Sequence, residues 1–283
     1  MGDIDINGMD EAGTTPLIWA AMSGQAGVAE LLLGLGNINP DTPNHRGQTP
    51  LFCAAKNGHG AVLKLLLGRG DVNPDRTDSK GRTPILCAAR NGHEGAVKLL
   101  LARKDINPDR TDRWDQTPIL RAAENGHEAV VELLLGRKDV NPDRPDCWDR
   151  TPISWAVENG HEGAVRLLLA RKDINPDRPD SWDRTPILWA AENGHEAMVR
   201  LLLGRKYVNP DKPDSQGRTP ISLAAKNGHE AAVRLLLGRE DVNPNRPDSK
   251  DRTPISRAAK NEHEAVLKLL LGWKDANPNT PDI

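Results

Sequence analysis

Histidine is the residue type whose spacing first suggests chemistry in this chain. Seven histidines recur every 34 residues, at His59, His93, His127, His161, His195, His229 and His263. Imidazole can bind metal ions or transfer protons, but the ligands of one ion must all lie within about 2.1 Å of it. Because equivalent residues of stacked repeats lie about 8–10 Å apart, we expect a structural role at a repeated turn, with no metal and no cofactor.

Carboxylates follow the same period and fall in loops or at helix ends, so we interpret them as a solvated face and not as paired acid–base residues. The sequence contains no Ser-His-Asp order, no phosphate-binding glycine loop and no Cys-x-x-Cys pair. We therefore expect no catalytic residue, and we predict that the protein is not an enzyme.

The dipeptide Thr-Pro marks the unit that must position these side chains. It recurs at steps of 34 residues, at Thr15, Thr49, Thr83, Thr117, Thr151, Thr185, Thr219 and Thr253. A fixed period of this size is typical of stacked supersecondary units, which bury their core between neighbours. We expect a single array over residues 1–283, with units near 12–45, 46–79, 80–113, 114–147, 148–181, 182–215, 216–249 and 250–283.

Each unit predicts two short helices followed by a turn. In the copy that begins at Thr151, threonine before Pro152 is typical of a helix N-cap and the first helical position. Gly160 indicates the end of this helix, because glycine readily adopts the left-handed conformation. A second helix is expected from about Glu162 to Ala170, and the proline-rich residues 171–184 predict an extended turn. The predicted fold is an all-α solenoid of eight helix-turn-helix units.

Charge and composition argue against several classes of protein. The 38 basic and 40 acidic residues give a formal net charge of −2, so we expect no nucleic-acid partner. We also expect no membrane association, because no apolar run approaches the 20 or so residues that a span needs. Cys53, Cys87 and Cys147 are expected to be free thiols, and no secretory signal is recognisable at the start. These features predict a cytoplasmic or nuclear protein that is not secreted.

The motifs of the unit resemble the ankyrin repeat. Thr-Pro-Ile-x-x-Ala-Ala is followed by Asn-Gly-His, Val-x-x-Leu-Leu-Leu and Asp-Val-Asn, in eight copies over essentially the whole chain. The loop Asp-Val-Asn-Pro-Asp-x-Pro-Asp is similar to that of ankyrin arrays of filamentous fungi, some of which follow an NTPase module in receptor-like proteins. The resemblance implies a protein–protein interaction module whose turn tips and first helices line a concave, partner-binding face.

Two departures from the family pattern affect the turns. The histidine of the family's Thr-Pro-Leu-His is replaced, for example by Leu120 and Ser154, so we expect fewer hydrogen bonds between turns and less rigid turns. The turn glycine is replaced by Asp115, Asp149, Asp183 and Asp251. Aspartate tolerates a positive φ better than most residues.

Three repeated positions change together in the central units and indicate a candidate binding surface. Tryptophan appears at the turn tips, tryptophan or arginine within the first helices, and glutamate at the ends of those helices. The residues are Trp114, Trp148, Trp182, Trp155, Trp189, Arg121, Glu124, Glu158 and Glu192. Because exposed tryptophan and arginine are enriched at binding hot spots, we expect repeats four to six to bind a protein segment. The carboxylates would favour a basic or mixed-charge partner.

Other interpretations of the same residues stay open. Duplication could have copied the three positions together, and tryptophan could stabilise the tips by stacking on the proline-rich turn or on arginine. The chain could also be the recognition region of a larger signalling receptor, or a purely structural spacer. Both end units lack the polar outer face that terminal repeats need, which predicts fraying, end-to-end self-association or a longer array.

Overall fold

The structure is a computed structural model that describes residues 5–273, and every regular element in that range is an α-helix. The helices form one antiparallel pair per repeat, so the predicted all-α solenoid of helix-turn-helix units is confirmed. The chain separates into two compact units, residues 1–147 and 148–283. The end of the repeat expected near 250–283 lies outside the described residues.

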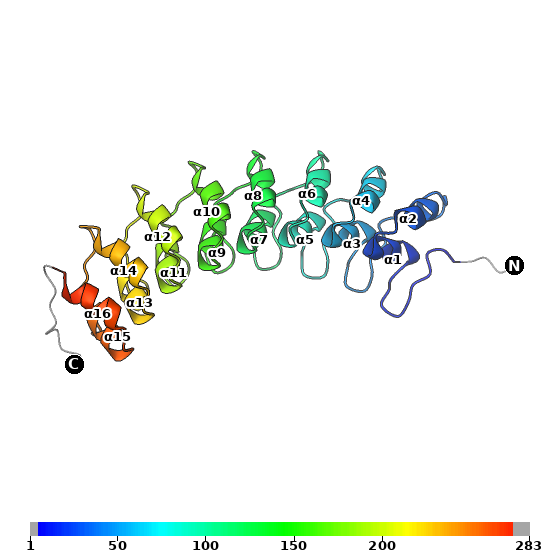
Figure 1. Ribbon diagram of the computed structural model, residues 1–283. Helices are drawn as coiled ribbons and strands as arrows, with labels where there is room; N and C mark the ends of the chain where they lie inside the picture. Colours follow the sequence, from blue (N-terminus) through cyan, green and yellow to red (C-terminus); the bar gives the residue numbers. More distant parts are fainter. Residues whose placement is uncertain (1–4, 274–283) are drawn as a thin grey trace. The chain divides into compact units, whose positions relative to one another are not determined.

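The first unit contains four helix pairs, in which each helix packs against its counterpart in the next pair (Figure 1). The helices are α1 (Pro16–Ser23), α2 (Ala26–Leu33), α3 (Pro50–Asn57), α4 (Gly60–Leu67), α5 (Pro84–Arg90), α6 (Glu94–Leu101), α7 (Pro118–Glu124) and α8 (Glu128–Leu135).

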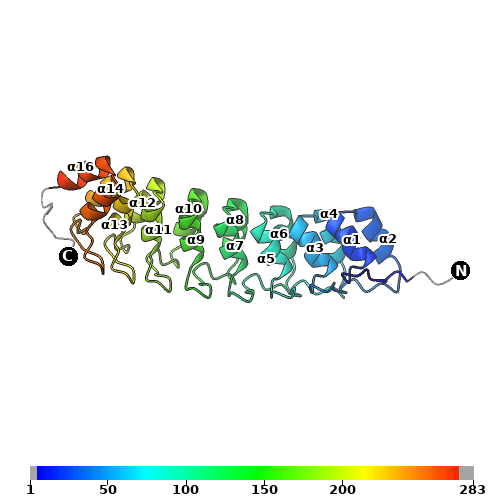
Figure 2. The same ribbon diagram turned by 90° about the horizontal axis from the view of Figure 1, so that it is seen from below.

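The second unit repeats this arrangement, and within it the long turns project on one side of the helices (Figure 2). Its helices are α9 (Pro152–Glu158), α10 (Glu162–Leu169), α11 (Pro186–Glu192), α12 (Glu196–Leu203), α13 (Pro220–Lys226), α14 (Glu230–Leu237), α15 (Pro254–Lys260) and α16 (Glu264–Leu271). Val165, Leu168, Val199 and Leu202 are fully buried between neighbouring pairs. Each such side chain stabilises the fold by roughly 1.5–3 kcal/mol.

The helix boundaries follow the capping residues that the sequence indicates. Thr117 is a typical case, because its Oγ1 accepts a hydrogen bond of 3.2 Å from the backbone N–H of Leu120. The first helices end near a glycine of positive φ, such as Gly58 with φ of 75°. Glu262 takes the place of this glycine in the last repeat and also has a positive φ, of 59°, which costs roughly 1–2 kcal/mol.

Within each unit, histidines link a repeat to the one before it. The Nε2 atom of His93 lies 3.0 Å from the carbonyl oxygen of Lys56, and His229 makes the same contact with Glu192 at 3.0 Å. The glycine before a histidine leaves room for the imidazole of the next repeat, since a Cβ at Gly58 would lie 2.7 Å from Nδ1 of His93. These contacts confirm the predicted structural role.

From the third repeat on, a buried aspartate lies in the turn that precedes the first helix. Asp180 Oδ1 accepts hydrogen bonds from the backbone N–H groups of Trp182 and Arg184, both at 2.9 Å. A backbone bond of 3.0 Å from Ser181 to the carbonyl oxygen of Trp148 joins neighbouring turns. We expected fewer hydrogen bonds at the turns because the family's histidine is replaced, but this carboxylate accepts hydrogen bonds there. The positive φ expected of aspartate at the glycine position is confirmed, for example at Asp183 with φ of 59°.

Asp248 has the largest set of partners among these aspartates. Burial opposes ionisation of its carboxyl, but hydrogen bonds from Arg252, from the backbone N–H of Lys250 and from Arg257 outweigh that effect and hold its pKa well below the usual range. The ionised form is therefore strongly favoured in the folded protein.

Apolar side chains are exposed on the first and last helix pairs. Leu31 of α2 is 76% exposed and Val28 is 43% exposed, while Leu271 of α16 is 52% exposed. In the described part of the chain, no helix has both the length and the apolar character that crossing a membrane requires.

The three cysteines should differ in reactivity. Cys53 and Cys87 are buried free thiols, and burial raises the pKa of Cys53 to about 12 and that of Cys87 to about 11. Cys147 is exposed. Because the thiolate is the reactive form, we expect a disulfide-exchange reagent at pH 8 to modify Cys147 rapidly. Cys53 and Cys87 should react only after unfolding. The Cys147→Ser variant should have no fast thiol, and three fast thiols in the native protein would contradict this assignment.

Replacing Asp248 should test the charged turn. Asp248→Asn keeps a side-chain oxygen that can accept hydrogen bonds from backbone N–H groups, as Asn44 does at the equivalent position. The variant leaves Arg257 without its buried counter-ion. We expect a loss of about 3 kcal/mol in urea unfolding at pH 7. Since the aspartate pKa is lower in the folded than in the unfolded protein, this difference should persist above about pH 4 and shrink as the pH falls further. The Asp214→Asn variant, which loses one arginine partner, is the control and should be affected less.

Candidate interaction surface

Four tryptophans of the second unit form the candidate surface, which we call the aromatic face. Trp148 and Trp182 stand at turn tips and are 37% and 50% exposed. Trp155 of α9 and Trp189 of α11 are half-buried on the first helices. The aromatic face therefore combines two accessible indoles with two that pack against other side chains.

Arginine stacking holds the two helical tryptophans. The guanidinium carbon of Arg150 lies 3.5 Å from the ring centroid of Trp155 and 4.5 Å from that of Trp189. Arg184 lies 3.5 Å from the centroid of Trp189. Such contacts stabilise by about 0.5–2 kcal/mol, depending on desolvation. The alternative that arginine stacks on tryptophan is thus confirmed for the helical pair, and Arg150 bridges α9 and α11.

The glutamates expected to attract a basic partner already have cationic partners. Glu158 forms an ion pair with Arg150, and Glu192 forms one with Arg184. Each carboxylate therefore neutralises the arginine that stacks on the tryptophan of the same repeat. The electrostatic argument for a strongly basic partner loses its support, because these charges are balanced within the protein.

One turn aspartate positions both kinds of tryptophan. Asp180 Oδ2 accepts a hydrogen bond of 3.3 Å from Nε1 of Trp189, while its Oδ1 binds the backbone N–H of Trp182. The tip and the helix of repeat six are therefore held by the same carboxylate. This contact fixes the backbone at Trp182 but leaves half of its side chain exposed.

An open hollow of about 310 Å³ lies at the edge of the aromatic face. It is lined by Arg150, Trp182, Arg184, Trp189, Ser215, Gln216 and Arg218. Indole surfaces, guanidinium groups and small polar side chains meet there. A volume of this size can receive one or two side chains of a bound protein segment.

The three predicted residues of repeat four belong to the first unit. Trp114 is half-buried, and the guanidinium carbon of Arg113 lies 5.9 Å from its ring centroid. Arg121 occupies the helical position of Trp155 and pairs with Glu124 at 2.7 Å and with Asp112 at 3.9 Å. In this repeat too, the carboxylate expected to attract a partner is neutralised locally.

The sequence analysis missed Arg150, Arg184 and Asp180. A signal for them was present, because arginine stands directly before the Thr-Pro dipeptide in four successive repeats, at Arg150, Arg184, Arg218 and Arg252. That position lies within the residues expected to form an extended turn. Among the described residues, no group of three or more His, Cys, Asp or Glu side chains is arranged to hold a metal ion.

Comparison with known families agrees with the geometry of the helix pairs. A family model described as ankyrin repeats in three copies matches residues 2–78, 60–146, 119–214 and 206–282. A search of curated proteins gave no match. The family matches cover nearly the whole chain, and the histidine-linked helix pairs fit them. The chain belongs to the ankyrin repeat family.

Proposed function

We propose that this protein is a binding module that holds an extended segment of a partner protein on the aromatic face. Ankyrin repeats generally mediate protein–protein interaction. The observation that carries the proposal is the placement of exposed Trp182 beside the stacked pair of Arg184 and Trp189, around a hollow of about 310 Å³. Tryptophan and arginine that are held rigidly lose little entropy on binding and are typical hot-spot residues.

The chemistry of the aromatic face favours a mixed-charge segment that contains proline or aromatic residues. Flat indoles accept proline rings or aromatic side chains. The paired Glu158 and Glu192 hold the arginines in place and do not supply free negative charge. We propose that Trp114, Arg121 and Glu124 of repeat four, in the first unit, also contact a partner protein.

Two other functions fit the same fold. The chain could be the recognition region of a larger signalling receptor, and it would then use the same face. A structural spacer would have no partner and would tolerate substitution of the exposed tryptophans. The buried free thiols of Cys53 and Cys87 support a reducing compartment, so we propose the cytoplasm or the nucleus.

Self-association is a separate proposal, and it rests on the exposed leucine of α2. Leu31 is 76% exposed beside Val28, and covering such side chains stabilises an assembly. We expect the chain to dimerise with rising concentration in sedimentation, and we expect Leu31→Glu to prevent it. A wild-type chain that stays monomeric at high micromolar concentration would contradict the proposal.

The exposed and the stacked tryptophans should differ in their effect on stability. Trp189→Leu removes two arginine contacts and one hydrogen bond, and leucine occurs at the equivalent Leu223. We expect a loss of about 1–3 kcal/mol in urea unfolding. Trp182→Leu should change stability by less than about 0.5 kcal/mol, because half of this indole is exposed. Equal losses in the two variants would show that the tip tryptophan is structural.

Binding should depend on the tip tryptophans. We expect a Trp148→Ala/Trp182→Ala double variant to lose partner proteins that the wild type retains in quantitative affinity capture, by at least about tenfold. Arg46→Ala/Lys80→Ala changes two equivalent tips of the first unit and serves as the control. If all three proteins retain the same partners, the aromatic face does not bind them and the spacer function is favoured.

A further inference from the structure

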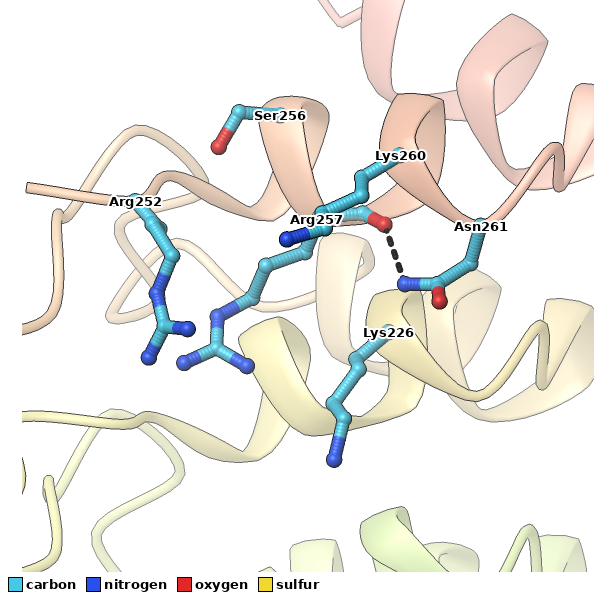
Figure 3. A pocket seen from close by; sticks show the side chains of 6 residues that line it. All are labelled: Lys226, Arg252, Ser256, Arg257, Lys260 and Asn261. Atoms are coloured by element: carbon cyan, nitrogen blue, oxygen red, sulfur yellow. Dashed lines mark hydrogen bonds between the residues drawn. The ribbon is translucent and has the colours of Figure 1, made fainter. Parts of the chain in front are cut away.

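A small basic hollow at the end of the second unit lies outside the aromatic face. It has a volume of about 180 Å³, and it lies against α13, α15 and the turn before α15. Figure 3 shows its lining residues, Lys226, Arg252, Ser256, Arg257, Lys260 and Asn261. Four of these six side chains are cationic.

Arg257 distinguishes this hollow from the three preceding repeats. The equivalent position is occupied by Trp155, Trp189 and Leu223 in those repeats, and none of them is charged. The equivalent Arg121 of repeat four pairs with Glu124, whereas Lys260 stands in place of that glutamate here. Arg257 is only 5% exposed, and its buried Nε has no hydrogen-bond partner. Placing an arginine here costs solvation free energy, and its one ionic contact does not satisfy every donor.

The cations outnumber their counter-ions. Arg252 and Arg257 share one carboxylate, that of Asp248, with Arg252 Nε at 3.0 Å. Among residues 5–273, no ion pair involves the ammonium group of Lys226 or that of Lys260, and both side chains are exposed. The hydroxyl of Ser256 donates a hydrogen bond of 3.0 Å to the carbonyl oxygen of Thr253. The four cationic side chains therefore dominate the charge of the hollow.

Neighbouring repeats do not supply the missing negative charge. Glu192 takes the place of Lys226 one repeat earlier, but Arg184 already neutralises it. The turn carboxylate of the preceding repeat, Asp214, is bound by Arg218 at 2.5 Å. Both of these carboxylates are therefore already paired with an arginine of their own repeat.

We propose that this hollow binds a phosphate monoester, presented as phosphoserine or phosphothreonine on a protein segment. Guanidinium groups bind tetrahedral oxyanions through paired N–H donors, and ammonium groups add charge without a fixed direction. Four cations against one carboxylate match the dianionic charge of a phosphate monoester better than the single charge of a carboxylate. The hollow is confined and has no aromatic platform, and the chain as a whole is slightly acidic, so nucleic acid fits it less well.

A labelled peptide tests this site directly. The probe is a short glycine–serine peptide that carries one phosphoserine and a fluorophore, measured by anisotropy at about 0.15 M salt, where exposed long-range charge is screened. We expect binding that the unphosphorylated peptide does not show and that inorganic phosphate competes away. Lys226→Ala/Lys260→Ala should weaken the affinity by at least about tenfold.

Two matched variants separate the site from general charge. Lys56→Ala/Arg90→Ala removes cations at the same helix ends in the first unit, where Cys53 and Cys87 replace the buried arginine, and should bind as the wild type does. Arg257→Leu recreates the arrangement at Leu223 and should weaken binding while circular dichroism shows a folded protein.

Trp148→Ala/Trp182→Ala should leave phosphopeptide binding unchanged, so the two proposals fail or succeed separately.

Several results would overturn the proposal. Equal binding of the phosphorylated and unphosphorylated peptides would show that phosphate is not recognised. Equal losses in the Lys226/Lys260 and Lys56/Arg90 variants would show that only general charge matters. Tighter binding of a single-stranded oligonucleotide that lacks a terminal phosphate would point to nucleic acid instead.

Discussion

Each helix pair of this protein can bury its apolar side chains only against the neighbouring pair, and the rest of the structure depends on that constraint. A pair of helices of seven or eight residues has no core of its own, so its leucines and valines need the next repeat. The imidazole of His229 reaches back to the carbonyl oxygen of Glu192 at 3.0 Å and fixes the spacing of the two layers. Glycine is favoured before the histidine where another repeat follows, because a Cβ at Gly194 would lie 2.5 Å from Nδ1 of His229.

The arginine that stands directly before Thr-Pro has three different environments in these repeats. Where the first helix carries a cysteine or leucine, as at Leu223, the arginine binds the turn aspartate, and Arg218 contacts Asp214 in this way. Where the helix carries tryptophan, as at Trp189, the guanidinium of Arg184 stacks on the ring and pairs with Glu192. A single side chain on the first helix thus decides whether the arginine before Thr-Pro binds the turn aspartate or stacks on a tryptophan.

The third environment occurs in the last described repeat, where Arg257 competes with Arg252 for Asp248. Two guanidinium groups on one carboxylate leave positive charge that the fold does not neutralise. The aromatic face and the basic hollow therefore arise from the same frame through different residues at one helical position. This explains how nearly identical repeats can present chemically distinct surfaces along one chain.

The sequence alone determined the features that depend on local contacts repeated at a fixed interval. Thr-Pro starts each first helix, glycine or aspartate provides the positive φ, and the period of 34 residues implies stacking, because all of these act within one or two repeats. It could not determine whether Trp148 and Trp155 are equally accessible, or whether Glu158 is free. Those outcomes depend on where the guanidinium of Arg150 lies, and a long flexible side chain is positioned only when the neighbouring helix and turn are packed around it.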